Sequence, residues 1–353
     1  MAACSGGENA RQTGTVGTGG SVAASGGAGG SSGAIGSGGQ ATGGEATGGQ
    51  ATGGQATGGQ AGQATGGSAG GGAPSGGTAG VGDPGDYPIG NPPVPSAACG
   101  TQTTVTTGER TINSTNQNRV YYIDVPNNYD MNQPYRFFYI SHWIGSRYQD
   151  MVNNNFYGLK TMAEAAGEPA IFLAPSSDGS TWQEKDHALF DDLLAFVKEN
   201  LCIDTSRVFT TGFSFGGMIT YSLSTNHQQD LRAAVGIAPA NYNIWLPQKT
   251  HEPIAWMQTT GMSDGTCPWD QNGSTNGAKY IAIEKGEDNH CNAPSEIPTW
   301  QSGDHVCYDY DGCDENHPTK VCTFNGGHQA ESSDPGSNEN WIPQVSWEFF
   351  TQF

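Results

Sequence analysis

The stretch RVFTTGFSFGGMITYSL, residues 207–223, places Ser214 between two glycines. An apolar run of β-forming residues precedes the serine, and a helical pattern follows it. The central GFSFG, residues 212–216, fits G-x-S-x-G, the signature of a nucleophile on a sharp strand-to-helix turn. The stretch therefore predicts a serine nucleophile, provided that the flanking strand and helix form.

Glycine is concentrated in the first part of the chain, where QATGG repeats almost without interruption before residue 95. Such a segment cannot bury enough apolar surface to offset the entropy lost on ordering. We expect residues 1–95 to form a flexible tether. Residues 96–353 are then one domain, of a size that suits a single α/β core.

The chain is acidic, with a formal net charge of −20 at pH 7, and residues 1–95 carry little of this charge. An acidic surface repels nucleic acid and anionic membranes. No stretch is long and apolar enough to span a bilayer. We therefore expect no nucleic-acid partner, no membrane-spanning segment and a monomeric protein.

Cysteine usage points to a compartment outside the cytoplasm. The AACSG sequence at residues 2–6 resembles the end of a bacterial lipoprotein signal, in which Cys4 would carry the lipid; the alternative is a chance cysteine in a tail. Seven further cysteines lie in the expected domain, a density typical of oxidising compartments. We expect a secreted protein or a bacterial cell-surface protein.

Strands and helices alternate along the domain. Strands are predicted at 119–126, 135–143, 170–174, 207–211, 233–237, 253–258, 304–310 and 320–324, and helices at 157–166, 186–201, 215–224, 277–285 and the C-terminus. The alternation implies a mostly parallel sheet covered on both faces, with the opening strands antiparallel at one edge. This is the layout of an α/β-hydrolase, with Ser214 at the carboxyl end of a central strand.

A serine hydroxyl needs a base within hydrogen-bond reach and a carboxylate that orients the base. In this fold the chain order is serine, acid, histidine. Asp264 lies in the loop after the predicted strand 253–258, and His328 lies in the loop after 320–324. The remaining candidates are less well placed, because they lie farther from a strand end, follow a helix, begin a strand or sit in polar loops: Asp270, Asp288, His227, His290, His305 and His317.

Acyl transfer also needs donors for the oxyanion. The backbone N–H of Phe215, the residue after the nucleophile, is the first expected donor. The second should come from the loop after the strand 135–143, where ISHWIGS places Trp143. We expect the Trp143 ring to line the acyl pocket; the alternative is a core tryptophan.

No metal or other cofactor is expected. The acidic segment DYDGCDEN, residues 309–316, misses the EF-hand spacing, and no cysteine pair forms a C-x-x-C. A solvated hairpin turn explains the segment instead. A different class of protein, a silent carbohydrate-binding or adhesion module on a hydrolase frame, is disfavoured by the intact set of Ser214, Asp264 and His328.

Several motifs resemble the feruloyl esterases of carbohydrate esterase family 1, especially the fungal type D enzymes: HWIGS, NNNFYGLKTMA, IFLAPSS, TW, NLCIDTSRVFTTGFSFGGMITYSL, FNGGH and WEFFTQF. The resemblance covers residues 98–353, and the superfamily also holds polyhydroxybutyrate depolymerases and acetylxylan esterases. It implies the same Ser214, Asp264 and His328 triad, and it places Trp182 near the substrate cleft.

The expected substrates are feruloyl esters on plant polysaccharide, with polyhydroxyalkanoate or other polyester and acetylxylan as alternatives. The segment GMSDGTCPW departs from the family pattern through Cys267 and Trp269, and we include Trp269 with Trp143 and Trp182 as substrate-binding candidates. This segment and the acidic DYDGCDENHPTKVC flank the acid and histidine loops, so they put the substrate preference in question.

Seven cysteines cannot all pair within the domain. Cys99 with Cys202 would pin the start of the domain to the end of a helix. Cys291 and Cys313 bracket the segment between the late helix and the hairpin, a pairing that the resemblance also suggests. Cys322 can pair with Cys307 across the hairpin or with Cys267 between the catalytic loops; the low loop-closure cost favours Cys307.

Overall fold

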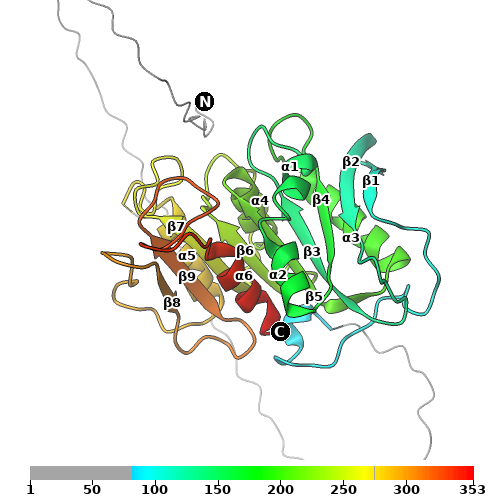
Figure 1. The fold of residues 1–353 in the computed structure, drawn as a ribbon. Coiled ribbons are helices and arrows are strands. Elements are labelled where there is room, and N and C mark those ends of the chain that lie inside the picture. Colours follow the sequence, from blue (N-terminus) through cyan, green and yellow to red (C-terminus); the bar gives the residue numbers. More distant parts are fainter. Residues whose placement is uncertain (1–81, 274) are drawn as a thin grey trace, which may run out of the picture. The chain divides into compact units, whose positions relative to one another are not determined.

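The computed structural model describes residues 82–273 and 275–353. Within them, nine strands form one sheet in the order β1-β2-β4-β3-β5-β6-β7-β9-β8 (Figure 1). The strands are β1 (Gly108–Ser114), β2 (Gln117–Asp124), β3 (Tyr135–Ser141), β4 (Ile171–Pro175), β5 (Ile203–Phe213), β6 (Ala233–Ile237), β7 (Ala255–Gly261), β8 (Val306–Asp309) and β9 (Thr319–Phe324).

The sheet is mostly parallel, as expected. The neighbours from β4 through β3, β5, β6 and β7 to β9 run parallel, whereas β1 and β2 at one edge and β8 at the other are antiparallel. The expectation of antiparallel opening strands holds for β2 but is wrong for β3. The chain passes from β3 through two helices before it enters β4, and such a crossover makes β3 and β4 parallel.

Helices cover both faces of the sheet. In Figure 1, α1 (Tyr148–Asn153), α2 (Leu159–Ala166) and α6 (Ile342–Thr351) lie in front of the strands. The other face packs against α3 (Lys185–Asn200), α4 (Phe215–Leu223) and α5 (Ala278–Asp288). Aromatic side chains fill both layers: Phe138 contacts Phe172 and Phe350 on the α6 side, and Tyr139 packs edge-on against Phe190 of α3.

Two elements were not anticipated from the sequence. The first is β1, whose sequence GERTINS leaves alternate side chains exposed, so it lacks the apolar signal of a buried strand. The second is α1, which has six residues and is too short for a helical period to be recognised. β5 also begins earlier than the predicted 207, at Ile203.

The packed domain begins before residue 96. The Ser96 N–H donates to the carbonyl of Ile203, and Arg207 donates to the carbonyl of Asn91, which is itself buried. A short 3-10 helix, η1 (Pro84–Asp86), precedes this segment. Residues 82–95 therefore pack on the domain as its first part, because their backbone groups pair with β5. The rest of the expected tether, with Cys4, lies outside the described residues.

Three disulfides join described parts of the domain, and they match the pairings favoured above: Cys99–Cys202, Cys291–Cys313 and Cys307–Cys322. Cys307 faces Cys322 across the β8–β9 hairpin, which confirms that choice over Cys267. Cys267 is fully buried and belongs to none of these three bonds. Among the described helices, none combines the length and apolar character that crossing a bilayer requires.

The disulfides differ in the length of chain that they close. Cys99–Cys202 closes 103 residues and Cys307–Cys322 closes 15. The chain-entropy relation gives about 4.7 kcal/mol for a loop of about 100 residues and about 3 kcal/mol for about 15. We expect the pair Cys99→Ala with Cys202→Ala to lower the free energy of unfolding more than Cys307→Ala with Cys322→Ala. Guanidinium unfolding of both variants measures this; the reverse order would contradict it.

Candidate active site

Ser214 occupies a strained turn between β5 and α4. Its backbone has φ 57° and ψ −118°, a left-handed conformation that costs a residue with a Cβ on the order of 1–3 kcal/mol. The Ser214 N–H donates to the carbonyl of Ile237 at 2.9 Å, which ties the turn to the end of β6. The expected strand, turn and helix are all present, and the serine projects from the carboxyl end of β5.

The glycines of the turn are required by close backbone approach. A Cβ on Gly216 would lie 2.2 Å from the carbonyl oxygen of Ser141, and a Cβ on Gly212 would lie 2.5 Å from the carbonyl of Gly216. Neither contact is sterically possible for a larger residue without a backbone shift. The turn therefore packs directly on Ser141, the last residue of β3.

The structure brings Ser214, His328 and Asp264 together. His328 Nε2 lies 2.7 Å from Ser214 Oγ, and His328 Nδ1 lies 2.8 Å from Asp264 Oδ2. Nδ1 donates its hydrogen to the carboxylate, and Nε2 accepts the hydroxyl hydrogen of the serine. The three side chains come from the carboxyl ends of β5, β7 and β9, on one edge of the sheet. Such an arrangement can activate a serine hydroxyl.

Two backbone amides orient Asp264. Its Oδ1 accepts the N–H groups of Thr266 at 2.8 Å and Cys267 at 2.7 Å, so only Oδ2 faces the imidazole. The Asp264 side chain is fully buried, while His328 is 16% exposed. The carboxylate is thus fixed by its own loop and shielded from solvent.

The acid and histidine loops are joined through their backbones. The Met262 N–H donates to the carbonyl of Phe324 at 3.0 Å, and the Ser263 N–H donates to Gly326 at 2.9 Å. These bonds continue the parallel pairing of β7 with β9 beyond the strand ends. The separation between Asp264 and His328 is therefore set by the main chain.

The two expected oxyanion donors have defined orientations. The carbonyl of Ser214 accepts a bond inside α4, so the N–H of Phe215, on the opposite side of the trans peptide, points out of the helix N-terminus. The carbonyl of His142 accepts the indole N–H of Trp182 at 2.8 Å. By the same geometry, the N–H of Trp143 points away from that indole.

The side chains that support this loop were not predicted from the sequence. His142 is fully buried; its Nδ1 donates to the Trp143 carbonyl at 2.7 Å, and its Nε2 accepts the Ser177 N–H at 3.0 Å. The Tyr157 hydroxyl donates to the carbonyl of Ser141 at 3.0 Å. The only sequence signal was a histidine beside the expected donor, and nothing in its pattern indicated the partners. These bonds fix the loop after β3.

The three tryptophan candidates have different positions. The half-buried Trp143 ring lies 6.3 Å from that of Phe213, which in turn lies 4.8 Å from His328, so the Phe213 ring connects Trp143 to the triad. Trp182 is 2% exposed and donates to the His142 carbonyl, so it supports the loop that carries Trp143 and offers little surface to a substrate. Trp269 packs against the small core between α5 and β9.

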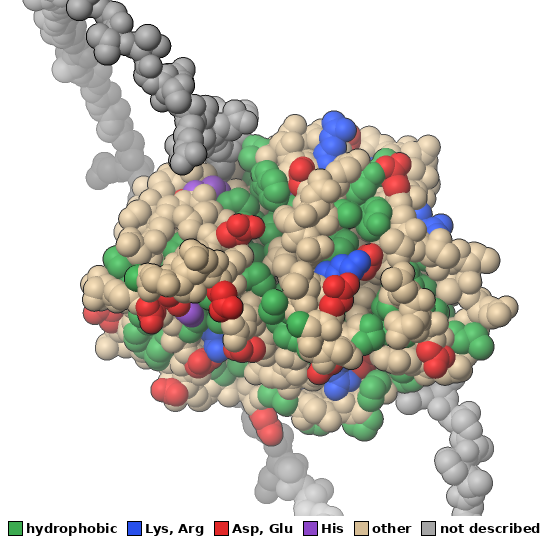
Figure 2. Space-filling model, in the orientation of Figure 1, with side chains coloured by type: hydrophobic (Ala, Val, Ile, Leu, Met, Phe, Trp, Pro, Cys, Tyr) green, Lys and Arg blue, Asp and Glu red, His purple; other side chains and the backbone are tan. Residues whose placement is uncertain are grey.

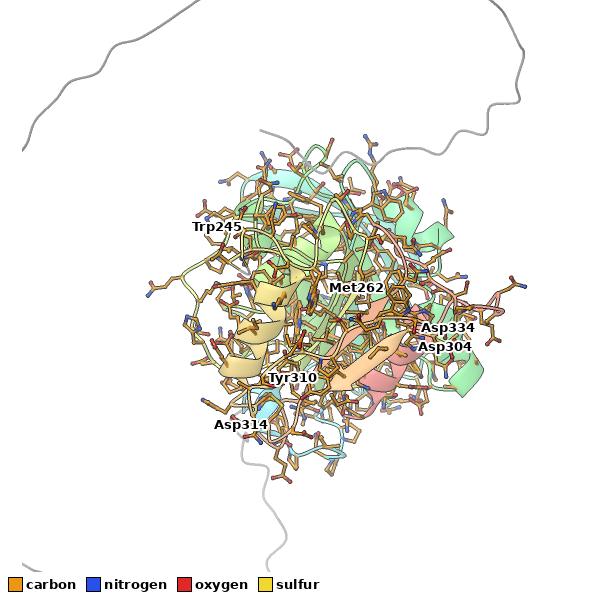
Figure 3. All side chains as sticks on the ribbon, turned by 90° about the vertical axis from the view of Figure 1, so that its left-hand side faces the viewer. Trp245, Met262, Asp304, Tyr310, Asp314 and Asp334 are labelled. Carbon is orange, nitrogen blue, oxygen red and sulfur yellow. A yellow bond between two sulfur atoms is a disulfide. The ribbon has the colours of Figure 1, made fainter. Side chains whose placement is uncertain are left out.

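Five of the six rejected candidates, all but His317, pair with another side chain: His227 with Asp191, Asp288 with His251, His290 with Asp314, His305 with Asp334, and Asp270 with Lys279. In Figure 3, Asp314 lies well below Met262, at which the acid loop begins. Geometry and sequence position thus select the same acid and the same base.

Acidic side chains are gathered on one part of the surface. Figure 2 shows several of them on the left of this face, over β8 and β9, and others spread over its centre and right, in keeping with the acidic composition. Across residues 82–273 and 275–353, no three His, Cys, Asp or Glu side chains are grouped so that they could hold a metal ion.

Curated relatives place the chain in a family. A probable feruloyl esterase C of Aspergillus terreus is 33% identical over 264 residues, which are 72% of this chain and 91% of that protein. The chain belongs to the feruloyl esterase family. Feruloyl esterase D of Neurospora crassa is 29% identical to this chain, over 73% of this chain and 91% of the Neurospora protein. The resemblance identified from the motifs is confirmed.

A family model and a solved structure also match the chain. A model of the prolyl oligopeptidase family matches residues 179–285 of the esterase, a span that includes Ser214 and Asp264. The solved feruloyl esterase module from Clostridium thermocellum superposes with a TM-score of 0.48 and 14% identity, over 76% of this chain and 95% of that one. The sheet order and the family membership identify the fold as an α/β-hydrolase.

The buried His142 predicts a pH dependence of stability. Burial lowers the pKa of His142 to about 4, because the charged imidazolium loses its solvation. An unfolded imidazole titrates near pH 6.5, so between about pH 6.5 and 4 the unfolded chain binds more protons. The neutral His142 imidazole contributes fully to stability above pH 6.5. As the pH falls from about 6.5 to 4, the free energy of unfolding decreases by up to about 1.4 kcal/mol per pH unit.

His142→Gln should therefore flatten the fall in unfolding free energy between about pH 6.5 and 4. Denaturant unfolding at several pH values measures the slope. His290→Gln removes an exposed histidine and is the matched control. Equal slopes in the wild type and His142→Gln would show that this residue does not carry the effect.

Proposed function

We propose that the chain is a serine esterase that hydrolyses feruloyl esters on plant cell-wall polysaccharide. The observation that carries the proposal is the chain of two short contacts from Ser214 through His328 to Asp264, in a member of the feruloyl esterase family. The enzyme is a carboxylic ester hydrolase. Three disulfides suit an oxidising compartment, where such a polymer would be encountered.

In the first half of the reaction, Ser214 Oγ attacks the ester carbonyl and His328 Nε2 takes the hydroxyl proton. Asp264 stabilises the imidazolium that forms, and the amides of Phe215 and Trp143 donate to the oxyanion. Collapse of the tetrahedral intermediate breaks the bond to the alcohol oxygen, which leaves with the proton from His328. The acyl group remains on Ser214 as an ester.

In the second half, His328 removes a proton from water, which attacks the acyl-enzyme carbonyl. A second tetrahedral intermediate forms on the same oxyanion donors and collapses to the free acid, while Ser214 regains its proton. The turn at Ser214 presents the serine at the carboxyl end of β5, and the bond to His328 Nε2 orients its oxygen. No step requires a group from outside the described residues except substrate and water.

Aromatic side chains favour an aromatic acyl group. The rings of Trp143 and Phe213 stand beside His328, where an acyl chain on Ser214 would lie. A flat ring such as ferulate can pack against such surfaces and gain about 0.5–1.5 kcal/mol beyond area burial. This supports ferulate over acetate or a polyester of small hydroxy acids.

Removing the nucleophile should abolish the reaction. We expect Ser214→Ala to fold normally and to lose methyl ferulate hydrolysis by about 10⁶-fold in kcat. His328→Ala should be of similar severity, and combining it with Ser214→Ala should add little, because the residues act as a unit. Steady-state kinetics with circular dichroism as the folding check decide this. Activity of Ser214→Ala within tenfold of the wild type would remove the serine from the mechanism.

The acyl preference is tested with esters of one alcohol. The wild-type chain should show a kcat/KM at least about tenfold higher for methyl ferulate than for methyl acetate, a difference of about 1.4 kcal/mol. Release of hydroxybutyrate from a polyester film should be slow by comparison. Equal kcat/KM values for the two methyl esters would favour an acetylxylan esterase, and rapid film erosion would favour a polyester depolymerase.

A further inference from the structure

We propose that a polar cavity beside the loop after β3 is a saccharide subsite, which binds sugar residues of the polymer chain that carries the ester. The cavity has a volume of about 430 Å³ and lies between the β1–β2 hairpin, the start of α1 and the loop after β4. This inference rests on the proposed function, because it assigns the alcohol side of the same substrate.

The cavity is connected to the loop that carries the expected oxyanion donor Trp143. Ser177 lines it, and the Ser177 N–H donates to His142, the residue before Trp143. The Gly145 N–H donates to the carbonyl of Ser180, so the loops after β3 and β4 are joined a second time. In the sheet order β2-β4-β3-β5, the loop after β4 is two strands from Ser214, or about 10 Å. A short oligosaccharide can span that distance from its esterified hydroxyl.

The lining suits hydroxyl groups and does not suit an acyl chain. Gln117, Asn118 and Gln149 each carry an amide that can donate and accept, which matches a sugar hydroxyl. The aromatic ring available there, Tyr148, is 8% exposed and stacks on Tyr122, so it offers little apolar surface. The two halves of the ester would therefore bind in different places, the ring at Trp143 and the sugars in this cavity.

The charges around the cavity leave Arg147 available. Arg119 pairs with Asp186, and Lys185 pairs with Asp178. Across the described residues, the exposed Arg147 side chain has no ion-pair partner. A guanidinium presents its donors in a planar fork, which can engage two adjacent hydroxyls. Arg147 is thus the cation of the lining that is free to bind a ligand.

Two polar groups of the lining are buried beneath its surface. Arg119 lines the cavity with a side chain that is 3% exposed, and its Nη1 has no hydrogen-bond partner, although Nη2 donates to Asp186 and to the carbonyl of Ser176. Ser177 Oγ is also buried and without a partner. Both atoms are covered by neighbouring protein atoms, so the proposal rests on the accessible groups of the lining, Gln117, Asn118, Arg147 and Gln149.

The test compares two substrates that share the acyl group. Methyl ferulate has no sugar, whereas a feruloylated arabinoxylan oligosaccharide extends from the same ester. We expect Arg147→Ala combined with Gln149→Ala to raise KM for the oligosaccharide about tenfold with kcat within about twofold, and to leave the kinetics on methyl ferulate unchanged. Both side chains are exposed, so the double variant should fold.

Arg136→Ala is the matched control, since Arg136 lies at the other end of β3 and pairs with Glu168 on the surface. If the double variant and Arg136→Ala have the same KM values on both substrates, the subsite proposal is wrong. Calorimetric titration of the full chain with unesterified xylo-oligosaccharide gives an independent readout, in which binding should be about tenfold weaker in the double variant.

The two proposals fail in different ways. If the wild-type chain does not hydrolyse methyl ferulate, the proposed function is wrong, and the titration still decides whether the cavity binds saccharide. If the chain hydrolyses methyl ferulate but binds the unesterified oligosaccharide no more tightly than the double variant does, the subsite is wrong and the esterase remains.

Discussion

The active-site geometry depends on the close packing of the turn at residues 212–216 against the carbonyl of Ser141, at the end of β3. Gly216 has no space for a Cβ against the carbonyl of Ser141, so the turn can pack on that residue only in one way. This contact sets the position of Ser214 relative to the loop that follows β3. His142 and Trp182 hold the same loop from beneath. Nucleophile and oxyanion donors are consequently positioned by close backbone packing and by two buried side chains.

The parts of the site that the sequence could predict rest on local patterns and on sheet topology. The run before Ser214 and the helix after it are recognisable because each signal involves neighbouring residues. Asp264 and His328 followed from a rule of placement, since the carboxyl ends of parallel strands meet at one edge. Cys307 and Cys322 were paired because a hairpin brings adjacent strands together.

The parts that could not be predicted depend on contacts between distant segments. The resemblance placed Trp182 near the substrate cleft, but it did not reveal the bond from the buried indole to the carbonyl of His142. The packing of residues 82–95 on β5 depends on backbone pairing that composition does not reveal. β1 was missed because a half-exposed edge strand carries little apolar signal. The polar cavity likewise forms only where three separate loops meet.

The bonds from Met262 and Ser263 to the histidine loop involve only backbone atoms. Such bonds do not use the side chains of Met262 and Ser263, so the spacing of acid and base is insulated from substitutions at these two positions, whereas Gly261 and Gly326 have no space for a Cβ. Residues around them are thereby free to diverge under selection for new substrates without loss of the chemistry. A scaffold of this kind can evolve different specificities while it retains one reaction.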